Sequence, residues 1–115
     1  NMAFSEIELA RIEKAVGGLC KRRNRPEFKA ELSLEYSLKG HNVNIFERRP
    51  RWDDKPGITE TPVAKLTFTR TSGKWRLFWM RGNLKWHAYE AKSTRGDLSE
   101  LVSEVDSDVW GCFFG

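Results

Sequence analysis

The sequence predicts an α+β fold: an N-terminal helix, a curved five-stranded antiparallel meander, and a short C-terminal helix packed on one face of the sheet. Apolar residues recur at helical spacing near both ends, and they alternate with polar residues in the middle. Glycine-containing turns separate the alternating segments. The 115 residues, of which 39% are hydrophobic and 31% charged, fit a single domain over residues 1–115.

The N-terminal helix begins at Ser5, where a serine N-cap and Glu8 three residues later match a capping box. Its apolar stripe repeats at helical spacing and comprises Leu9, Ile12, Val16 and Leu19. We expect the helix to end in the basic residues 21–23, because cations favour a helix C-terminus and Pro26 follows.

Alternation predicts a strand over residues 31–38, a turn at 39–42 and a second strand from Val43. A loop with two prolines should occupy residues 48–57, and a third strand should run from about Pro62 to Arg70. The pairs Ser72-Gly73 and Gly82-Asn83 predict two tight turns on either side of the fourth strand.

The C-terminal helix is predicted from an apolar face that comprises Leu98, Leu101, Val102 and Val105. Asp97 or Thr94 should cap it. The tail at 109–115 is too apolar to extend into water, and we expect it to pack against the domain.

Residues 74–90, KWRLFWMRGNLKWHAYE, hold most of the candidate surface. A two-residue turn at Gly82-Asn83 would set Trp79 opposite Trp86 and Trp75 opposite Glu90. With a similar turn at Ser72-Gly73, the core rows would be Leu66, Trp79 and Trp86, then Phe68, Leu77 and Ala88. These rows contain no charge and should face the helices, although a shift of one residue would exchange the two faces.

The opposite face would then mix rings and cations. Its predicted rows are Lys65, Met80 and Lys85; Thr67, Phe78 and His87; and Thr69, Arg76 and Tyr89. Sheets that bind single-stranded nucleic acids combine rings that stack on bases with cations that meet phosphates. A solvated face, partly covered by a helix or a second subunit, is the alternative.

The charge distribution supports a polyanion ligand in part. The net charge is +4, but residues 65–95 carry +7, from eight cations and one anion, and residues 97–115 carry five anions and no cation. The acidic C-terminal segment could fold back and neutralise the basic sheet.

A second candidate site is the loop with Arg48, Arg49, Arg51 and Trp52, because arginines on a loop can fork onto phosphate or carboxylate. In the alternative interpretation, Trp52 packs at the edge of the core and the arginines are solvated. The only arrangement that suggests catalysis comprises Asp53, Asp54, Glu90 and Lys92, which could hold a divalent metal beside a lysine. That pattern is short and made of common residues.

The sequence indicates no metal site and no cofactor. Cys20 and Cys112 are far apart in the chain, and no paired-ligand spacing links them to His41 or His87. No apolar segment is long enough to span a membrane, and no export leader is apparent, so we expect a cytoplasmic protein with no membrane partner. In that compartment both cysteines should be free thiols, with a disulfide as the alternative.

The segments MAFSEIELARIEKAV, PVAKLTFTRTSGKWRLFWM, KWHAYE and GCFFG resemble a family of small bacterial proteins known only as a domain of unknown function, of the DUF3024 type. The resemblance spans nearly the whole chain, from Met2 to Gly115. It implies a stand-alone bacterial cytoplasmic protein, and it supplies no activity and no site residues.

The leading hypothesis is therefore a non-enzymatic binding module whose ligand is a nucleic acid or another polyanion. The alternatives are a metal-dependent phosphodiesterase-like enzyme and a structural domain that forms homodimers or binds another protein. Single-strand binding that weakens with salt would favour the first, magnesium-dependent cleavage the second, and a dimer that buries Phe78 the third.

Overall fold

The computed structural model describes residues 4–24, 32–50, 57–89 and 95–115. The N-terminal helix comprises α1 (Glu6–Ile12), a π-helical turn η1 (Glu13–Gly17) and α2 (Gly18–Arg23). The strands are β1 (Ser33–Lys39), β2 (Asn42–Pro50), β3 (Ile58–Thr69), β4 (Lys74–Met80), β5 (Trp86–Ala88) and the short β6 (Arg95–Gly96), and the C-terminal helix is α3 (Leu98–Ser107). The predicted α+β fold is confirmed.

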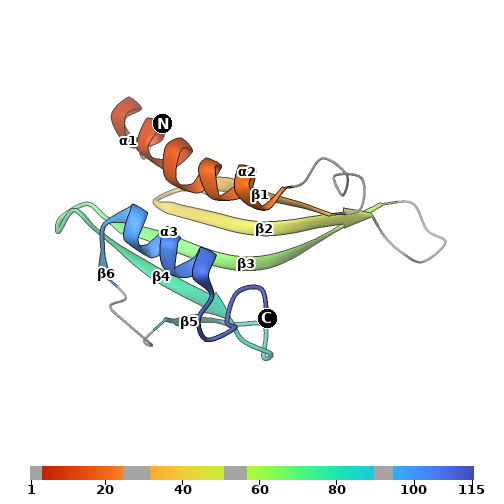
Figure 1. Cartoon of the computed structure of the whole chain (residues 1–115). Helices are drawn as coiled ribbons and strands as arrows, with labels where there is room; N and C mark the ends of the chain where they lie inside the picture. The colour runs from red at the N-terminus through yellow and green to blue at the C-terminus, as the bar shows by residue number, and fades with distance from the viewer. Residues whose placement is uncertain (1–3, 25–31, 51–56, 90–94) are drawn as a thin grey trace.

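The sheet is an antiparallel meander in the order β1-β2-β3-β4-β5, with β6 added beside β4 (Figure 1). The middle hairpin is longer than predicted, because β2 continues to Pro50 and β3 begins at Ile58. Arg48 pairs with Glu60 across these strands, and opposite charges directly across a hairpin stabilise it. The prediction of a loop from residue 48 is therefore wrong for residues 48–50.

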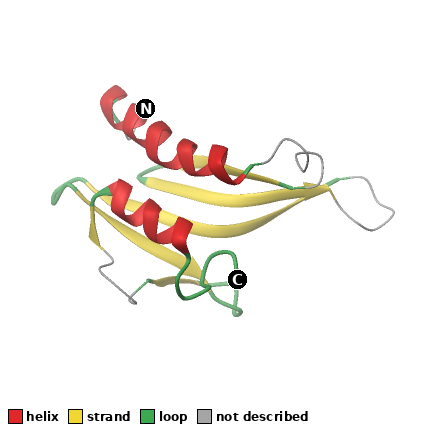
Figure 2. Ribbon diagram, in the orientation of Figure 1, coloured by secondary structure: helices red, strands yellow, loops and turns green. Residues whose placement is uncertain are grey.

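Both helices lie on the same face of the sheet, which we call the helix face (Figure 2). Its buried strand residues include Leu34, Val43, Ile45, Ala64, Leu66, Trp75 and Leu77, which alternate along the chain, and Val63 is buried beside Ala64 at the irregularity in the β2–β3 register. The helix residues that join them in the core include the predicted Ile12, Val16, Leu19, Leu98, Leu101, Val102 and Val105. Apolar residues that repeat about every 3.6 residues in the helices and every 2 residues in the strands thus pack together in one core.

Ser5 and Glu8 form the predicted capping box. The Ser5 Oγ accepts from the Glu8 backbone N–H at 3.2 Å, and Glu8 Oε1 accepts from the Ser5 N–H at 2.8 Å. Arg70 also donates to both oxygens of Glu8, at 3.0 and 3.2 Å. These bonds, Arg70 first and Ser5 second, lower the pKa of Glu8 from 4.5 to about 2 and tie the helix start to the end of β3.

The C-terminal tail is anchored by Asp108, which ends α3 in a left-handed conformation. Its carboxylate accepts hydrogen bonds from the backbone N–H groups of Phe113 and Phe114, each at 2.9 Å. Phe113 is buried against Tyr89, and the guanidinium carbon of Arg23 lies 3.6 Å from the Phe114 ring centroid. The tail therefore packs as expected, although Trp110 remains 64% exposed.

Both cysteines are free thiols. Cys20 is buried among the core residues, and burial, with the Glu13 and Glu35 carboxylates nearby, raises its pKa to about 11. Burial and Asp108 also raise the pKa of Cys112. Because the thiolate is the reactive form, neither environment activates a nucleophile.

Candidate functional site

The turn between β4 and β5 decides which side chains reach each face. Arg81 N donates to Lys85 O at 3.2 Å, Leu84 N donates to Arg81 O at 2.9 Å, and Leu84 is left-handed, with φ 62°. The turn therefore contains Leu84 as well as the predicted Gly82-Asn83 pair. One extra turn residue moves every β5 side chain to the other face.

As a result, Met80 pairs with Trp86, and Trp79 pairs with His87. The predicted Trp79–Trp86 pair is wrong, and so is the predicted Leu77–Ala88 pair, since Ala88 lies opposite Phe78. The β3–β4 turn is also longer than predicted, with Thr69 opposite Lys74. The β3–β4 register therefore shifts by two residues. A shift by an even number leaves each β4 side chain on its predicted face of the sheet but gives it a different partner on β3.

In the observed β3–β4 register, Leu66 pairs with Leu77 and Phe68 with Trp75. The predicted rows that joined Leu66 to Trp79 and Phe68 to Leu77 are therefore wrong. The register also sets Lys65 directly opposite Phe78, which brings a cation and a ring together on the far side of the sheet from the core.

We call that far side the open face. Its central residues are half-buried and are Asn44, Phe46, Lys65, Thr67, Arg76, Phe78, Met80, Trp86 and Ala88, and Arg48 extends it toward the far end of the sheet. Neither the N-terminal helix nor α3 covers it, because the buried residues of both helices belong to the core on the helix face (Figures 1 and 2).

The centre of the open face is a set of contacts between cations and rings. The Nζ of Lys65 lies 4.9 Å from the Phe78 ring centroid and 5.4 Å from the Trp86 centroid. The guanidinium carbon of Arg76 lies 5.2 Å from the Phe78 centroid. A ring holds a cation in this range at a gain of about 0.5–1 kcal/mol when exposed. The two cations are therefore positioned by aromatic rings.

Arg76 has an unusual environment. Its Nε is buried, and no described residue accepts a hydrogen bond from it. Unsatisfied buried donors are rare in native proteins, and a water or an ion is one of the partners that can complete them; the Arg48 Nε is a second such donor, but it lies 3.4 Å from Glu60 Oε2. The Arg76 guanidinium is the clearest candidate on this face for an anion contact.

The structure separates the remaining predicted residues of this face from Lys65, Arg76 and Phe78. Lys85 is exposed at the end of the hairpin, and His87 lies beside Asn83, with its Nε2 3.3 Å from the Asn83 amide nitrogen. Tyr89 is 1% exposed and donates to Glu104 Oε1 at 2.8 Å. The prediction that put these three on the open face is wrong, because it counted the turn one residue too short.

Trp86 is the open-face ring that sequence reasoning assigned to the core. No feature of the sequence signals the left-handed Leu84 that causes the change, since a leucine seldom adopts this conformation. Tyr89, by contrast, replaces Ala88 in the core, where burial first and the Glu104 hydrogen bond second raise its pKa.

The structure describes two arginines of the second candidate site, Arg48 and Arg49, and they lie on opposite faces of the sheet. Arg48 lies on the open face at the far end of the sheet. Its Nη1 is 3.5 Å from Glu35 Oε2 and its Nε is 3.4 Å from Glu60 Oε2, so these two carboxylates compensate its charge. Arg49 projects toward the other face and lies 3.6 Å from Glu47. The remaining candidates lie outside the described residues: Arg51, Trp52, Asp53, Asp54, Glu90 and Lys92. The enzymatic alternative stays a prediction, and the described ranges contain no acidic, histidine or cysteine cluster able to hold a metal.

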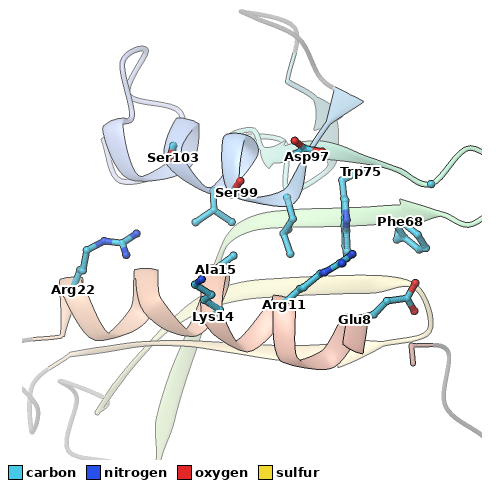
Figure 3. Close-up of a pocket in the computed structure, with 13 residues that line it drawn as sticks. Glu8, Arg11, Lys14, Ala15, Arg22, Phe68, Trp75, Asp97, Ser99 and Ser103 are labelled. Atoms are coloured by element: carbon cyan, nitrogen blue, oxygen red, sulfur yellow. The ribbon is translucent and has the colours of Figure 1, made fainter. Parts of the chain in front are cut away.

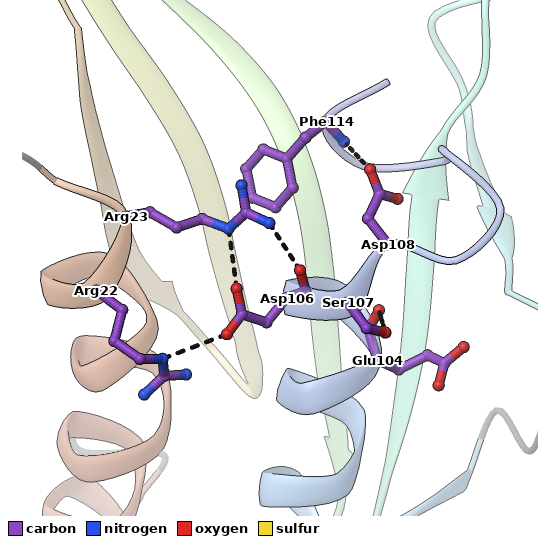
Figure 4. A network of polar contacts seen from close by, with 7 residues as sticks. All are labelled: Arg22, Arg23, Glu104, Asp106, Ser107, Asp108 and Phe114. Atoms are coloured by element: carbon purple, nitrogen blue, oxygen red, sulfur yellow. Dashed lines mark hydrogen bonds and ion pairs between the residues drawn. The ribbon is translucent and has the colours of Figure 1, made fainter.

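The acidic C-terminal helix does not neutralise the open face. The Asp106 carboxylate lies between the two helices, with Oδ2 3.3 Å from Arg22 Nε and Oδ1 3.1 Å from Arg23 Nε (Figure 4). Glu104 accepts from Tyr89, and Asp108 caps the tail. These three of the five anions after residue 96 are engaged on the helix face, with the sheet between them and Lys65.

A family model for a domain of unknown function, DUF3024, matches residues 4–115. The chain belongs to the DUF3024 family. No curated protein and no solved structure matches it. The described part of the chain also contains no helix that is both long and apolar enough to cross a bilayer.

Proposed function

We propose that this protein is a non-enzymatic binding module that holds single-stranded nucleic acid on the open face. The observation that carries the proposal is the juxtaposition of Phe78 and Trp86 with Lys65 and Arg76. Phe78 on β4 and Trp86 on β5 are diagonal neighbours, since Phe78 pairs with Ala88. Diagonal positions on adjacent strands are roughly 7–8 Å apart, so the two rings can receive successive bases.

The charges on this face suit a polyanion. Lys65 and Arg76 are held at the rings without a carboxylate partner in the described ranges. A phosphate contact would give the Arg76 Nε an acceptor, which no described residue supplies. Stacking on a ring does not depend on which base is stacked, so we expect binding with little sequence preference.

Fluorescence anisotropy with a labelled oligothymidylate of about 20 nucleotides tests the proposal. Phe78→Ala and Trp86→Ala should each weaken binding by about 1–3 kcal/mol, because each removes a stacking ring. Arg76→Ala should lower the slope of log affinity against log salt by about one, because one phosphate contact is lost.

Two matched controls should leave the affinity unchanged. His87→Ala alters the neighbour of Trp86 in β5 on the opposite face, and Trp110→Ala removes an exposed indole away from this sheet surface. Binding weaker than about 100 μM at about 50 mM salt, or equal loss in the controls, would overturn the proposal. A dimer in sedimentation that dissociates in the Trp86→Ala variant would instead assign the open face to a second copy of the chain.

A further inference from the structure

A groove of about 760 Å³ lies between the N-terminal helix and α3, on the helix face and thus away from the open face (Figure 3). Its floor is apolar and comprises Ala15, Phe68, Trp75, Leu98 and Val102. Sites for small molecules typically have volumes of roughly 300–1,000 Å³ and a mostly apolar lining with few polar groups. The groove has the volume of such a site, but its walls are more polar, because seven of its thirteen lining residues are charged or carry a hydroxyl.

The two walls of the groove differ in charge. Arg11, Lys14 and Arg22 line it from the N-terminal helix, and Figure 3 shows Arg11 reaching toward Trp75. Ser99 and Ser103 line it from α3, one helical turn apart, together with Asp97 at the start of that helix. Cations thus face hydroxyl groups across an apolar floor.

Pairing with neighbours leaves a small positive excess. Glu8, also at the groove, is held by Arg70, and Arg22 shares Asp106 with Arg23. Within the described ranges, neither Arg11 nor Lys14 has an acidic partner. Counted over the lining residues alone, three cations, Arg11, Lys14 and Arg22, stand against two carboxylates, Glu8 and Asp97, so the lining carries a net charge of +1.

We propose that this groove binds a small organic monoanion with a flat apolar body. The body would lie on Ala15 and Phe68, which are half-buried, and against the small exposed part of Trp75, and the anionic group would meet Arg11 and Lys14. A di- or triphosphate would bring several negative charges to a site that matches about one, and the unmatched charges would lose solvation without a partner. The site is independent of nucleic-acid binding, because the sheet separates it from Phe78 and Trp86.

The test uses a matched pair of fluorescent probes, 1-anilinonaphthalene-8-sulfonate and N-phenyl-1-naphthylamine. They share the aromatic body, and only the first carries the sulfonate. The sulfonate probe should bind with one-to-one stoichiometry and about tenfold more tightly than the neutral probe, which is the effect of one charge-assisted hydrogen bond. Arg11→Glu and Lys14→Glu should each weaken the sulfonate probe by about tenfold and leave the neutral probe unchanged.

Lys21→Glu is the matched control, because it makes the same charge change at an exposed position of α2 that does not line the groove. It should leave both affinities unchanged, and thermal melts check that all variants are folded. A second variant, Ser99→Trp, should abolish binding of both probes by filling the groove. Equal affinity for the two probes, an equal loss in Lys21→Glu, or full binding by folded Ser99→Trp would each overturn the proposal. Trp86→Ala should not change either probe's affinity, which keeps this outcome separate from the test of the open face.

Discussion

The two faces of β4 carry side chains of similar size but hold them in different ways. On the helix face, Trp75 is 8% exposed and Leu77 is 0% exposed, and both pack within the apolar core under the helices. On the open face, Phe78 and Met80 are only half-buried, and Phe78 lies between the cations of Lys65 and Arg76. The difference shows that the aromatic content of a strand does not identify its buried side. The buried side is identified instead by the residues that surround each ring.

The largest expected effect tests this difference directly. Leu77→Ala should lower the free energy of unfolding by about 2–5 kcal/mol, because it leaves a cavity in a closed core. Phe78→Ala, one residue along the same strand, should cost only about 1–2 kcal/mol, since it loses two cation–ring contacts and partial burial. Urea melts at matched protein concentration measure both. If Phe78→Ala proves as costly as Leu77→Ala, the open face is covered in solution, and a second copy would then be the first candidate.

A smaller effect concerns one polar group on the helix face, the Tyr89 hydroxyl. Tyr89→Phe keeps the ring against Phe113 but removes the hydroxyl that donates to Glu104, and it should cost about 1–2 kcal/mol. A hydrogen bond to a carboxylate is stronger than a neutral one, which sets this size. The same melts provide the measurement. A cost below about 0.3 kcal/mol would show that water replaces the hydroxyl and that Tyr89 is less enclosed than the structure indicates.

The alternation of residues in the sequence predicts the members of each face correctly for β3 and β4 but not for β5. Alternation is local, and it correctly placed Lys65, Arg76 and Phe78 together, because the error in the β3–β4 turn was an even number of residues. The face of β5 depends on the length of one turn, and there the error was a single residue. Turn length depends on the left-handed Leu84, a conformation that apolar side chains rarely adopt, so no pattern in the sequence announced it.

Leu84 therefore offers a test of the register that separates the two faces. It is 81% exposed and left-handed, a conformation that costs a non-glycine residue about 1–2 kcal/mol. Leu84→Gly should stabilise the protein by about 0.5–1 kcal/mol, because glycine relieves that cost and little burial is lost, while its greater freedom in the unfolded chain offsets part of the gain. Gly73→Ala, at another left-handed turn position, should have the opposite sign. Destabilisation by Leu84→Gly would argue for the shorter turn, with Trp86 on the helix face.

The smallest expected effect is a pH dependence of stability, which we expect for the loss of Arg70 and not for the loss of Arg76 on the open face. Arg70 is paired with Glu8, whereas Arg76 on the open face has no carboxylate within the described ranges. The pKa of Glu8 is about 2 in the folded protein against an ordinary 4.5, so the unfolded chain takes up a proton first as the pH falls. The stabilisation is therefore complete above about pH 5 and is lost as the pH approaches about 2.

Arg70→Met should lower the melting temperature at neutral pH, and the difference in melting temperature between this variant and the unmodified protein, which we call the gap, should narrow as the pH falls between these values. For the matched Arg76→Met variant the gap should stay constant over the same range, because no carboxylate among the described residues pairs with that arginine. A constant gap for Arg70→Met as well would show that Ser5 alone, through the capping box, holds the Glu8 charge.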